Sequence, residues 1–116
     1  MSYKIRTIEN FDRQAKKLAK HYHSFKTDFV KFLSDLKDNP YMGDDLGDGI
    51  RKVRMAIASK GKGKSGGARI ITYTTDVVIE KQEGEIVLLS IYDKSEQSTI
   101  SDNEIKELKK VALGEL

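Results

Sequence analysis

The sequence predicts an α+β fold, in which an antiparallel sheet carries helices on one face, in the order β-α-α-β-β-β-α. Apolar residues recur at helical spacing in three stretches of the chain. Four other stretches show strand-like alternation or short β-rich runs. Each predicted helix has a single apolar stripe, which has to be buried against the sheet. At 116 residues the chain suits one core of ordinary size, so residues 1–116 are expected to form a single domain.

The first half of the chain predicts a strand followed by a helical hairpin. In residues 3–7, charged side chains alternate with uncharged ones, as is typical of a strand. Two helical stripes follow, made of Phe11, Ala15, Leu18, Ala19 and Tyr22, and then of Phe25, Phe29, Phe32, Leu33 and Leu36. Only His23-Ser24 separates them, so a hairpin is expected. The second helix should end at Asn39-Pro40, because the residue before a proline is disfavoured in a helix.

The second half predicts three more strands after an acidic loop. Residues 41–49 form this loop, which contains two turn glycines. Strands are expected at 52–57, 69–79 and 86–92, with a turn at Glu83-Gly84.

A capping signal predicts the start of the last helix. Ser101 and Glu104 have the spacing of a capping box, and Ile100 and Ile105 have that of a hydrophobic staple. The helix that follows is expected to end near Gly114.

Composition excludes several classes of protein. The chain has no cysteine, which rules out disulfide frameworks, thiolate metal sites and cysteine nucleophiles. No apolar run approaches the ~20 residues of a membrane span, and the first residues lack the apolar segment of a signal peptide. A cytoplasmic location with no membrane partner is expected.

Two motif-like features are rejected. Gly63-Lys64-Ser65 looks like the end of a phosphate-binding P-loop, but Ala58 stands where that motif needs its first glycine. The aspartates before Gly49 suggest a calcium loop, but Leu46 and Met55 occupy positions at which ligands are required.

A basic segment at residues 49–75 is the most informative feature of the chain. Of 21 basic and 18 acidic residues, seven basic and no acidic ones lie in this segment, which leaves 14 basic and 18 acidic residues elsewhere. Glycines between the lysines at 60–67 allow a close approach to phosphate groups. The segment therefore predicts a polyanionic partner, and RNA is the first hypothesis.

Strand alternation is expected to collect several cations on one face of the sheet. Lys52 and Arg54 should project from the same face of their strand, and Arg69 lies on the strand that follows. With helices on one side only, the other face would be free, and these cations could converge on one phosphate. Tyr92 and Lys94 would add a stacking ring and another cation. The alternative is that Tyr92 only closes the sheet edge.

Three stretches carry a resemblance to a known family. They are Gly-Ile-Arg-Lys-Val-Arg at 49–54, Lys-Gly-Lys-Gly-Lys-Ser-Gly-Gly-Ala-Arg-Ile-Ile at 60–71 and Leu-Ser-Ile-Tyr-Asp-Lys at 89–94. With these, nearly the whole chain resembles the RelE/HigB-type toxins of bacterial type II toxin–antitoxin systems, which belong to the RelE/ParE superfamily.

The resemblance implies a microbial ribonuclease-like fold and cleavage of messenger RNA on the 70S ribosome, without a metal or other cofactor. It also implies neutralisation by a cognate antitoxin, expected to be a helix-turn-helix protein. The implied catalytic residues are Lys52, Arg54, Arg69, Tyr92 and Lys94, with Arg69 at the scissile phosphate and Tyr92 stacked on a base. The residues expected to bind RNA are Arg51, Lys60, Lys62, Lys64 and Tyr73.

Cleavage by 2′-OH attack needs a base, stabilisation of an anionic phosphorane and a proton for the leaving oxygen. Without a usable histidine pair, the stabilisation has to come from preorganised cations, a role that suits Arg54 and Arg69. Lys52 is a candidate base, because neighbouring cations favour its neutral amine, but the assignment stays open. Two alternatives are kept. One is a non-catalytic RNA- or ribosome-binding protein, and the other is a ParE-like gyrase inhibitor on the same fold.

Overall fold

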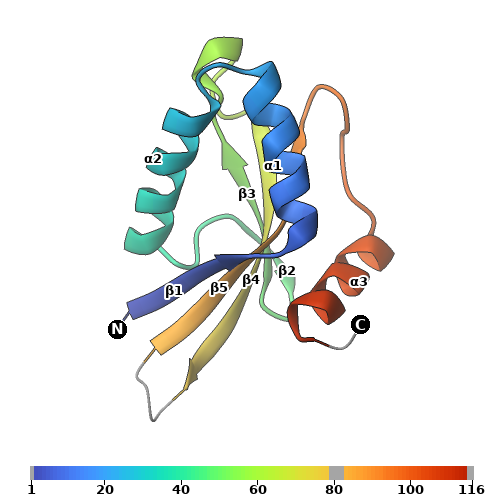
Figure 1. Cartoon of the computed structure of the whole chain (residues 1–116). Helices are drawn as coiled ribbons and strands as arrows, with labels where there is room; N and C mark the ends of the chain where they lie inside the picture. Colours follow the sequence, from blue (N-terminus) through green and yellow to red (C-terminus); the bar gives the residue numbers. More distant parts are fainter. Residues whose placement is uncertain (1, 79–82, 115–116) are drawn as a thin grey trace.

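The computed structural model describes residues 2–78 and 83–114, which form an α+β fold around one five-stranded sheet (Figure 1). Its elements are β1 (Ser2–Thr7), α1 (Glu9–His21), α2 (Phe25–Asp38), β2 (Asp44–Gly47), β3 (Ile50–Met55), the 3₁₀ turn η1 (Ala58–Lys60), β4 (Ala68–Val78), β5 (Glu83–Asp93) and α3 (Asp102–Ala112). The strands lie in the order β1-β5-β4-β3-β2. The predicted fold class, the helical hairpin and the C-terminal helix are confirmed.

One strand was missed by the sequence analysis. The acidic stretch 41–49, predicted as a loop, contains β2, which pairs antiparallel with β3 at the edge of the sheet. Aspartates are poor strand formers, but here Asp44 lies opposite Lys52 and Asp45 lies opposite Arg51. Opposite charges across a strand pair are favourable, and they compensate for the low propensity.

The pairing of β5 also differs from the expectation. β1 runs parallel to β5, so the sheet is mostly rather than wholly antiparallel. The turn predicted at Glu83-Gly84 is wrong, because both residues already belong to β5 and pair with Ser2 and Tyr3. Gly84 is needed there, since a Cβ would lie 2.4 Å from the Tyr3 ring. Ile79, predicted to end the preceding strand, lies outside the described residues.

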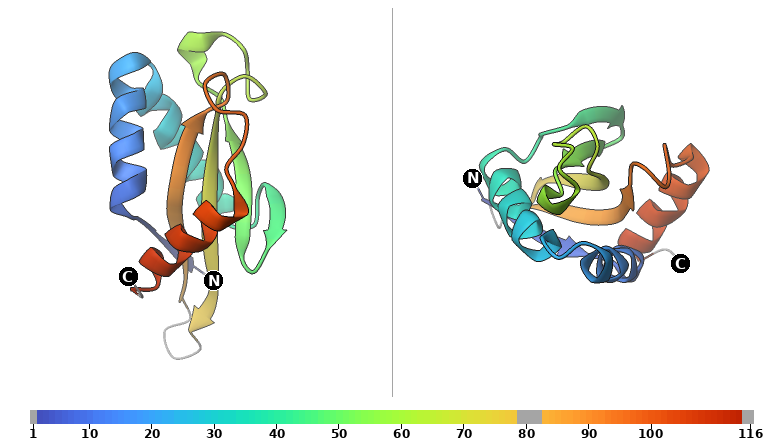
Figure 2. Two further views of the ribbon diagram at one scale, coloured as in Figure 1. Left: turned by 90° about the vertical axis from the view of Figure 1, so that its right-hand side faces the viewer. Right: turned by 90° about the horizontal axis from the view of Figure 1, so that it is seen from above.

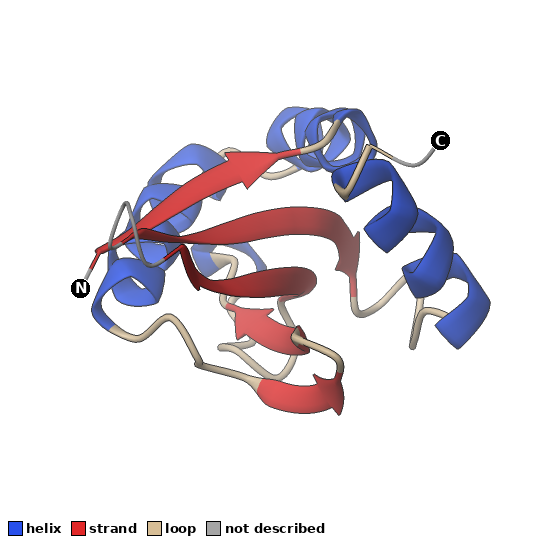
Figure 3. Ribbon diagram, turned by 90° about the horizontal axis from the view of Figure 1, so that it is seen from below, coloured by secondary structure: helices blue, strands red, loops and turns tan. Residues whose placement is uncertain are grey.

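The helices cover both faces of the sheet, not one. Seen from above, α2 and α3 lie on opposite sides of the sheet (Figure 2), and the view from below shows the same arrangement (Figure 3). On the face that carries Tyr73, the ammonium of Lys109 on α3 lies 4.9 Å from the centre of the tyrosine ring. A single apolar stripe shows that a helix is buried but not against which face. Only part of the face opposite α2 is therefore left open.

The start of α3 follows the predicted capping signal. The Ser101 hydroxyl accepts a hydrogen bond from the backbone N–H of Glu104 at 3.2 Å, and the staple residues Ile100 and Ile105 are buried. The helix ends at Ala112, whose carbonyl accepts a hydrogen bond from the Arg6 guanidinium at 2.6 Å. This contact ties the end of α3 to β1.

Side chains of α1 hydrogen-bond to the backbone of β5 in the part that β1 does not reach. β1 pairs with β5 only as far as Leu88. Beyond it, Asn10 donates to the carbonyl of Leu89 at 3.0 Å, and Gln14 accepts from the N–H of Ile91 at 3.0 Å. Both backbone groups are thereby paired without another strand.

Candidate functional site

The register of β3, β4 and β5 places three of the predicted catalytic residues in one row. Arg54 lies opposite Arg69, and Arg69 lies opposite Tyr92. Residues directly opposite one another in an antiparallel pair point to the same face, and Lys52 shares that face because it lies two residues before Arg54. The sheet thus gathers four of the five predicted residues.

A hollow of about 310 Å³ lies at the outer edge of β3, and we call it the cationic hollow. Its lining residues are Met42, Gly43, Asp44, Lys52, Val53, Arg54 and Lys64. Arg54 comes from β3, whereas Lys64 reaches the hollow from the basic loop, which we define as residues 61–67. Three cations against one carboxylate give the hollow a positive charge that suits a phosphate group. Because Asp44 lies opposite Lys52, this lysine has an acidic neighbour as well as cationic ones.

A second pocket, of about 240 Å³, adjoins the cationic hollow. It shares Arg54 and Lys64 with the hollow, and α2 and the end of β3 provide most of its other walls. Phe32 and Met55 make part of this wall apolar, while Asp35 adds a hydrogen-bond acceptor. Such a mixture of apolar walls and polar groups is typical of small-molecule pockets.

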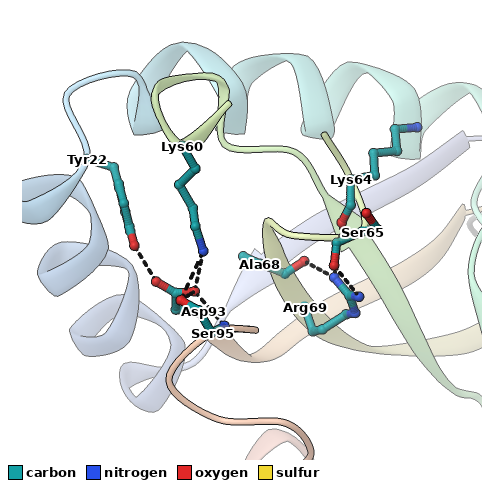
Figure 4. A network of polar contacts seen from close by, with 8 residues as sticks. All are labelled: Tyr22, Lys60, Lys64, Ser65, Ala68, Arg69, Asp93 and Ser95. Atoms are coloured by element: carbon teal, nitrogen blue, oxygen red, sulfur yellow. Dashed lines mark hydrogen bonds and ion pairs between the residues drawn. The ribbon is translucent and has the colours of Figure 1, made fainter. Parts of the chain in front are cut away.

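Arg69 is buried and holds the basic loop. The residue is only 7% exposed. Its guanidinium donates to the carbonyl oxygens of Lys64 at 3.1 Å, Ser65 at 3.0 Å and Ala68 at 3.3 Å (Figure 4). Arginine has five N–H donors in a planar fork, so further donors remain beyond these three bonds. The first role that the structure gives Arg69 is therefore to fix loop carbonyls.

Tyr92 is also buried, at 5% exposure, and within the described part of the chain its hydroxyl has no hydrogen-bond partner. Burial raises the pKa of this hydroxyl, while the charge of Arg69 acts in the opposite direction. A ring in this position is not open for stacking on a base, unlike the arrangement that the resemblance implies. This observation favours the alternative in which Tyr92 closes the sheet.

A buried carboxylate at the end of β5 forms the densest polar network near the site (Figure 4). Asp93, 3% exposed, accepts hydrogen bonds from the Tyr22 hydroxyl at 2.5 Å and from the Lys60 ammonium at 2.5 Å. The N–H and the hydroxyl of Ser95 add two more, at 2.9 and 2.7 Å. Three of these four donors reach Oδ1, and the Tyr22 hydroxyl alone reaches Oδ2.

The network shifts the titration of both acids within it. Burial acts to raise the pKa of Asp93, but the hydrogen bonds from Lys60, Tyr22 and Ser95 outweigh it and hold the pKa well below its usual range. The hydrogen bond to Asp93, followed by burial and by the carboxylate charge, raises the pKa of Tyr22 to about 12. The network is therefore built around an ionised Asp93.

Lys60 has a different position from the one predicted. It was expected to bind RNA with Lys62 and Lys64, but its side chain is 7% exposed and paired with Asp93, and it also lies 5.5 Å from the centre of the Tyr22 ring. Its charge is neutralised inside the protein, whereas Lys62 and Lys64 are exposed. The sequence offered one signal for this pair, an acid directly after the long apolar run of β5, because a buried acid needs a partner.

The turn η1, which carries Lys60, is fixed to the helical hairpin. The carboxylate of Asp28 on α2 accepts hydrogen bonds from the Ala58 N–H at 3.0 Å and from the Ser24 hydroxyl at 2.7 Å. The same hydroxyl accepts from the N–H of Ser59 at 2.9 Å. The start of the basic loop therefore has a fixed base.

The end of the basic loop crosses β3 closely. A Cβ on Gly67 would lie 2.1 Å from the carbonyl oxygen of Met55, so only glycine fits without a backbone shift. The carbonyl of Gly67 accepts a hydrogen bond from the N–H of Lys94 at 3.1 Å. Lys94, another predicted catalytic residue, is exposed and is thereby held next to the loop.

Two predicted RNA-binding residues lie apart from the site. Arg51 points to the face opposite that of Lys52, with its guanidinium 4.8 Å from the centre of the Tyr41 ring. Tyr73 lies four residues along β4 from Arg69, under Lys109 of α3. The structure does not bring either side chain to the cationic hollow.

A family model described as the RelE toxin of the RelE / RelB toxin–antitoxin system matches residues 4–115. The chain belongs to the RelE toxin family. It is therefore the toxin type of a toxin–antitoxin system, and an antitoxin is its expected partner. The match spans the hairpin, the basic loop and α3, in agreement with the resemblance that the sequence carried.

Residues 2–78 and 83–114 contain no helix that is both long and apolar enough to cross a bilayer. Over the same residues, no three His, Cys, Asp or Glu side chains are grouped so that they could hold a metal ion.

Proposed function

We propose that this RelE-family toxin is a ribosome-dependent endoribonuclease that cleaves messenger RNA by 2′-OH attack and so inhibits translation in the cytoplasm. The observation that carries the proposal is the cationic hollow, in which Lys52 and Arg54 of β3 meet Lys64 of the basic loop. Preorganised cations are what an anionic phosphorane requires.

The structure supports a division of roles among these cations. Arg54 is exposed, always charged and suited to two phosphate oxygens at once, so we assign it to the transition state. Lys64 binds the phosphate backbone from the basic loop. Arg69 acts mainly through the carbonyls that it holds, and its remaining donors can support the phosphate from beneath. The adjoining pocket beside Phe32 suits a nucleotide base.

The general base is not assigned to one residue. Lys52 lies in the cationic hollow, and no step of the proposal requires it to be the base rather than a phosphate ligand. Asp44, which lies opposite Lys52 across β2 and β3, places one carboxylate beside these cations. A cognate antitoxin, expected to be a helix-turn-helix protein, would keep the toxin inactive.

Single-turnover cleavage on programmed ribosomes tests the proposal. Wild-type protein should leave codon-phased cuts whose upstream fragments end in a 2′,3′-cyclic phosphate. Arg54→Ala should lower the cleavage rate about a hundredfold, by analogy with the loss of one oxyanion donor. Lys17→Ala, which removes an equal charge from the exposed side of α1, serves as the control and should cleave at the wild-type rate.

Three outcomes would contradict the proposal. Ribosome binding without any cut would favour the non-catalytic binding protein. Stimulated DNA cleavage by gyrase, with intact messages, would favour the ParE-like inhibitor. Equal rates for Arg54→Ala and wild type would remove the cationic hollow from the mechanism.

A further inference from the structure

The basic loop is held at its two ends, and two of its glycines lie in open space. Gly61 and Gly63 have left-handed φ angles of +70° and +62°, and a Cβ on either residue would have no neighbour within 4 Å. Glycines in such open positions give a chain many alternative conformations. Lys64 can line the cationic hollow only while the loop is kept over the end of β3.

Asp93 adds to the bonds by which Asp28 and Ser24 hold the turn before the loop. Lys60 is the last residue before the loop, and its ammonium lies 2.5 Å from one carboxylate oxygen of Asp93 and 3.2 Å from the Ser95 hydroxyl. The ring of Tyr22 packs on the same ammonium and its hydroxyl donates to the other carboxylate oxygen. A buried ammonium without its carboxylate would leave for solvent, and the tie between Lys60 and the end of β5 would be lost.

The end of the loop is held by two of the predicted catalytic residues. Arg69 binds the carbonyls of Lys64 and Ser65, and Lys94 binds the carbonyl of Gly67. Asp93 lies between Tyr92 and Lys94, so one short stretch of β5 and its continuation touches both ends of the loop. The carboxylate is too buried to contact RNA directly.

We propose that Asp93 is a positioning residue, which holds Lys60 and through it fixes the basic loop with Lys64 in the cationic hollow. The expected effect on message cleavage rests on the proposed nuclease function, whereas the expected effect on the loop does not. Nothing in the family match or in the sequence pattern assigned a role to Asp93, Lys60 and Tyr22 as a unit.

Asp93→Asn tests the inference, because the amide has the same shape but no charge to hold Lys60. On programmed ribosomes, the maximal single-turnover rate should fall about tenfold, since an effect on position acts on the chemical step. The apparent affinity for ribosomes should change less than about threefold, because the exposed cations are all retained. A purely destabilising substitution would not produce this split in a folded protein. Glu85→Gln is the matched control, as it breaks the half-exposed ion pair of Arg6 at the other end of β5.

Limited proteolysis gives a readout that needs no nuclease activity. Trypsin should cut after Lys62 and Lys64 faster in Asp93→Asn and in Lys60→Met than in wild type, and at the wild-type rate in Glu85→Gln. The double variant Lys60→Met/Asp93→Asn should match the single variants in trypsin sensitivity and in the rate of message cleavage. Either substitution alone already breaks the ion pair.

The inference is overturned if folded Asp93→Asn cuts messages within about twofold of the wild-type rate, or if its loop is no more sensitive to trypsin. If Asp93→Asn does not fold, Lys60→Met and Tyr22→Phe decide by the same two measurements. If wild type cuts no message, the proposed function fails, while the protease rates still decide whether Asp93 holds the loop.

Discussion

Replacing Lys60 by methionine should destabilise the protein far more than is usual for a lysine beside a glycine-rich loop. The substitution keeps an unbranched side chain of similar length but leaves the buried Asp93 carboxylate without its cation. Breaking a buried ion pair by removing one partner costs about 3–5 kcal/mol. Here Tyr22 and Ser95 still donate to the carboxylate, so we expect a loss near the low end, ~3 kcal/mol.

The pH dependence of this loss has a definite sign. The pKa of Asp93 is depressed in the folded protein, so the stability that it contributes is present above its ordinary unfolded value, about pH 4, and is lost as the pH falls further. Without Lys60, this pKa moves back up. The difference in unfolding free energy between wild type and Lys60→Met should therefore be largest near neutral pH and shrink below about pH 4.

Urea denaturation followed by circular dichroism at several pH values measures this difference. Lys62→Met is the matched control, because Lys62 is exposed on the same loop and its loss should cost less than about 0.5 kcal/mol. Equal stability of the two variants, or a difference that does not change with pH, would refute the reasoning about the buried pair.

Two further predictions concern the ends of the same network. Gly67→Ala should lower the unfolding free energy by ~2 kcal/mol or more, because its Cβ would lie 2.1 Å from the Met55 carbonyl oxygen. Gly61→Ala should cost only about 1 kcal/mol, from its left-handed φ angle. Equal losses in urea denaturation would show that the loop can shift to accommodate the new side chain. The hydroxyl of Tyr22, whose pKa is about 12, should give a late step in the ultraviolet titration of wild type that is missing from Tyr22→Phe. Because that pKa is raised, the stability gained from the neutral hydroxyl is full below about pH 10 and is lost as the pH rises towards 12. A difference between the two titration curves that is centred near pH 10 would contradict the bond to Asp93.

The sequence predicted the elements whose cause is local. The stripes of α1 and α2 and the cap at Ser101 depend on residues within a few positions of one another, and all are found in the structure. β2 could not be predicted in this way, because its aspartates favour a strand only when the cations of β3 lie opposite. Periodicity likewise identified α3 as buried without indicating the face that it covers.

The candidate site was predictable to the same extent. Alternation along β3 placed Lys52 and Arg54 on one face, and the register adds Arg69 to their row. The burial of Lys60 was not predictable, since its partner Asp93 is far away in sequence and meets it only in the folded chain. A basic segment records the number of cations but not which of them are neutralised internally.

The bonds that Asn10 and Gln14 make to the end of β5 beyond β1 have a consequence for whether another strand could join the sheet there. An unpaired run of N–H and carbonyl groups invites a strand from a second molecule, and self-association can follow. The carbonyl of Leu89 and the N–H of Ile91 are already taken by side chains of their own chain. A second copy would have to displace two helix-borne amides, and the helix that carries them, before it could extend the sheet there.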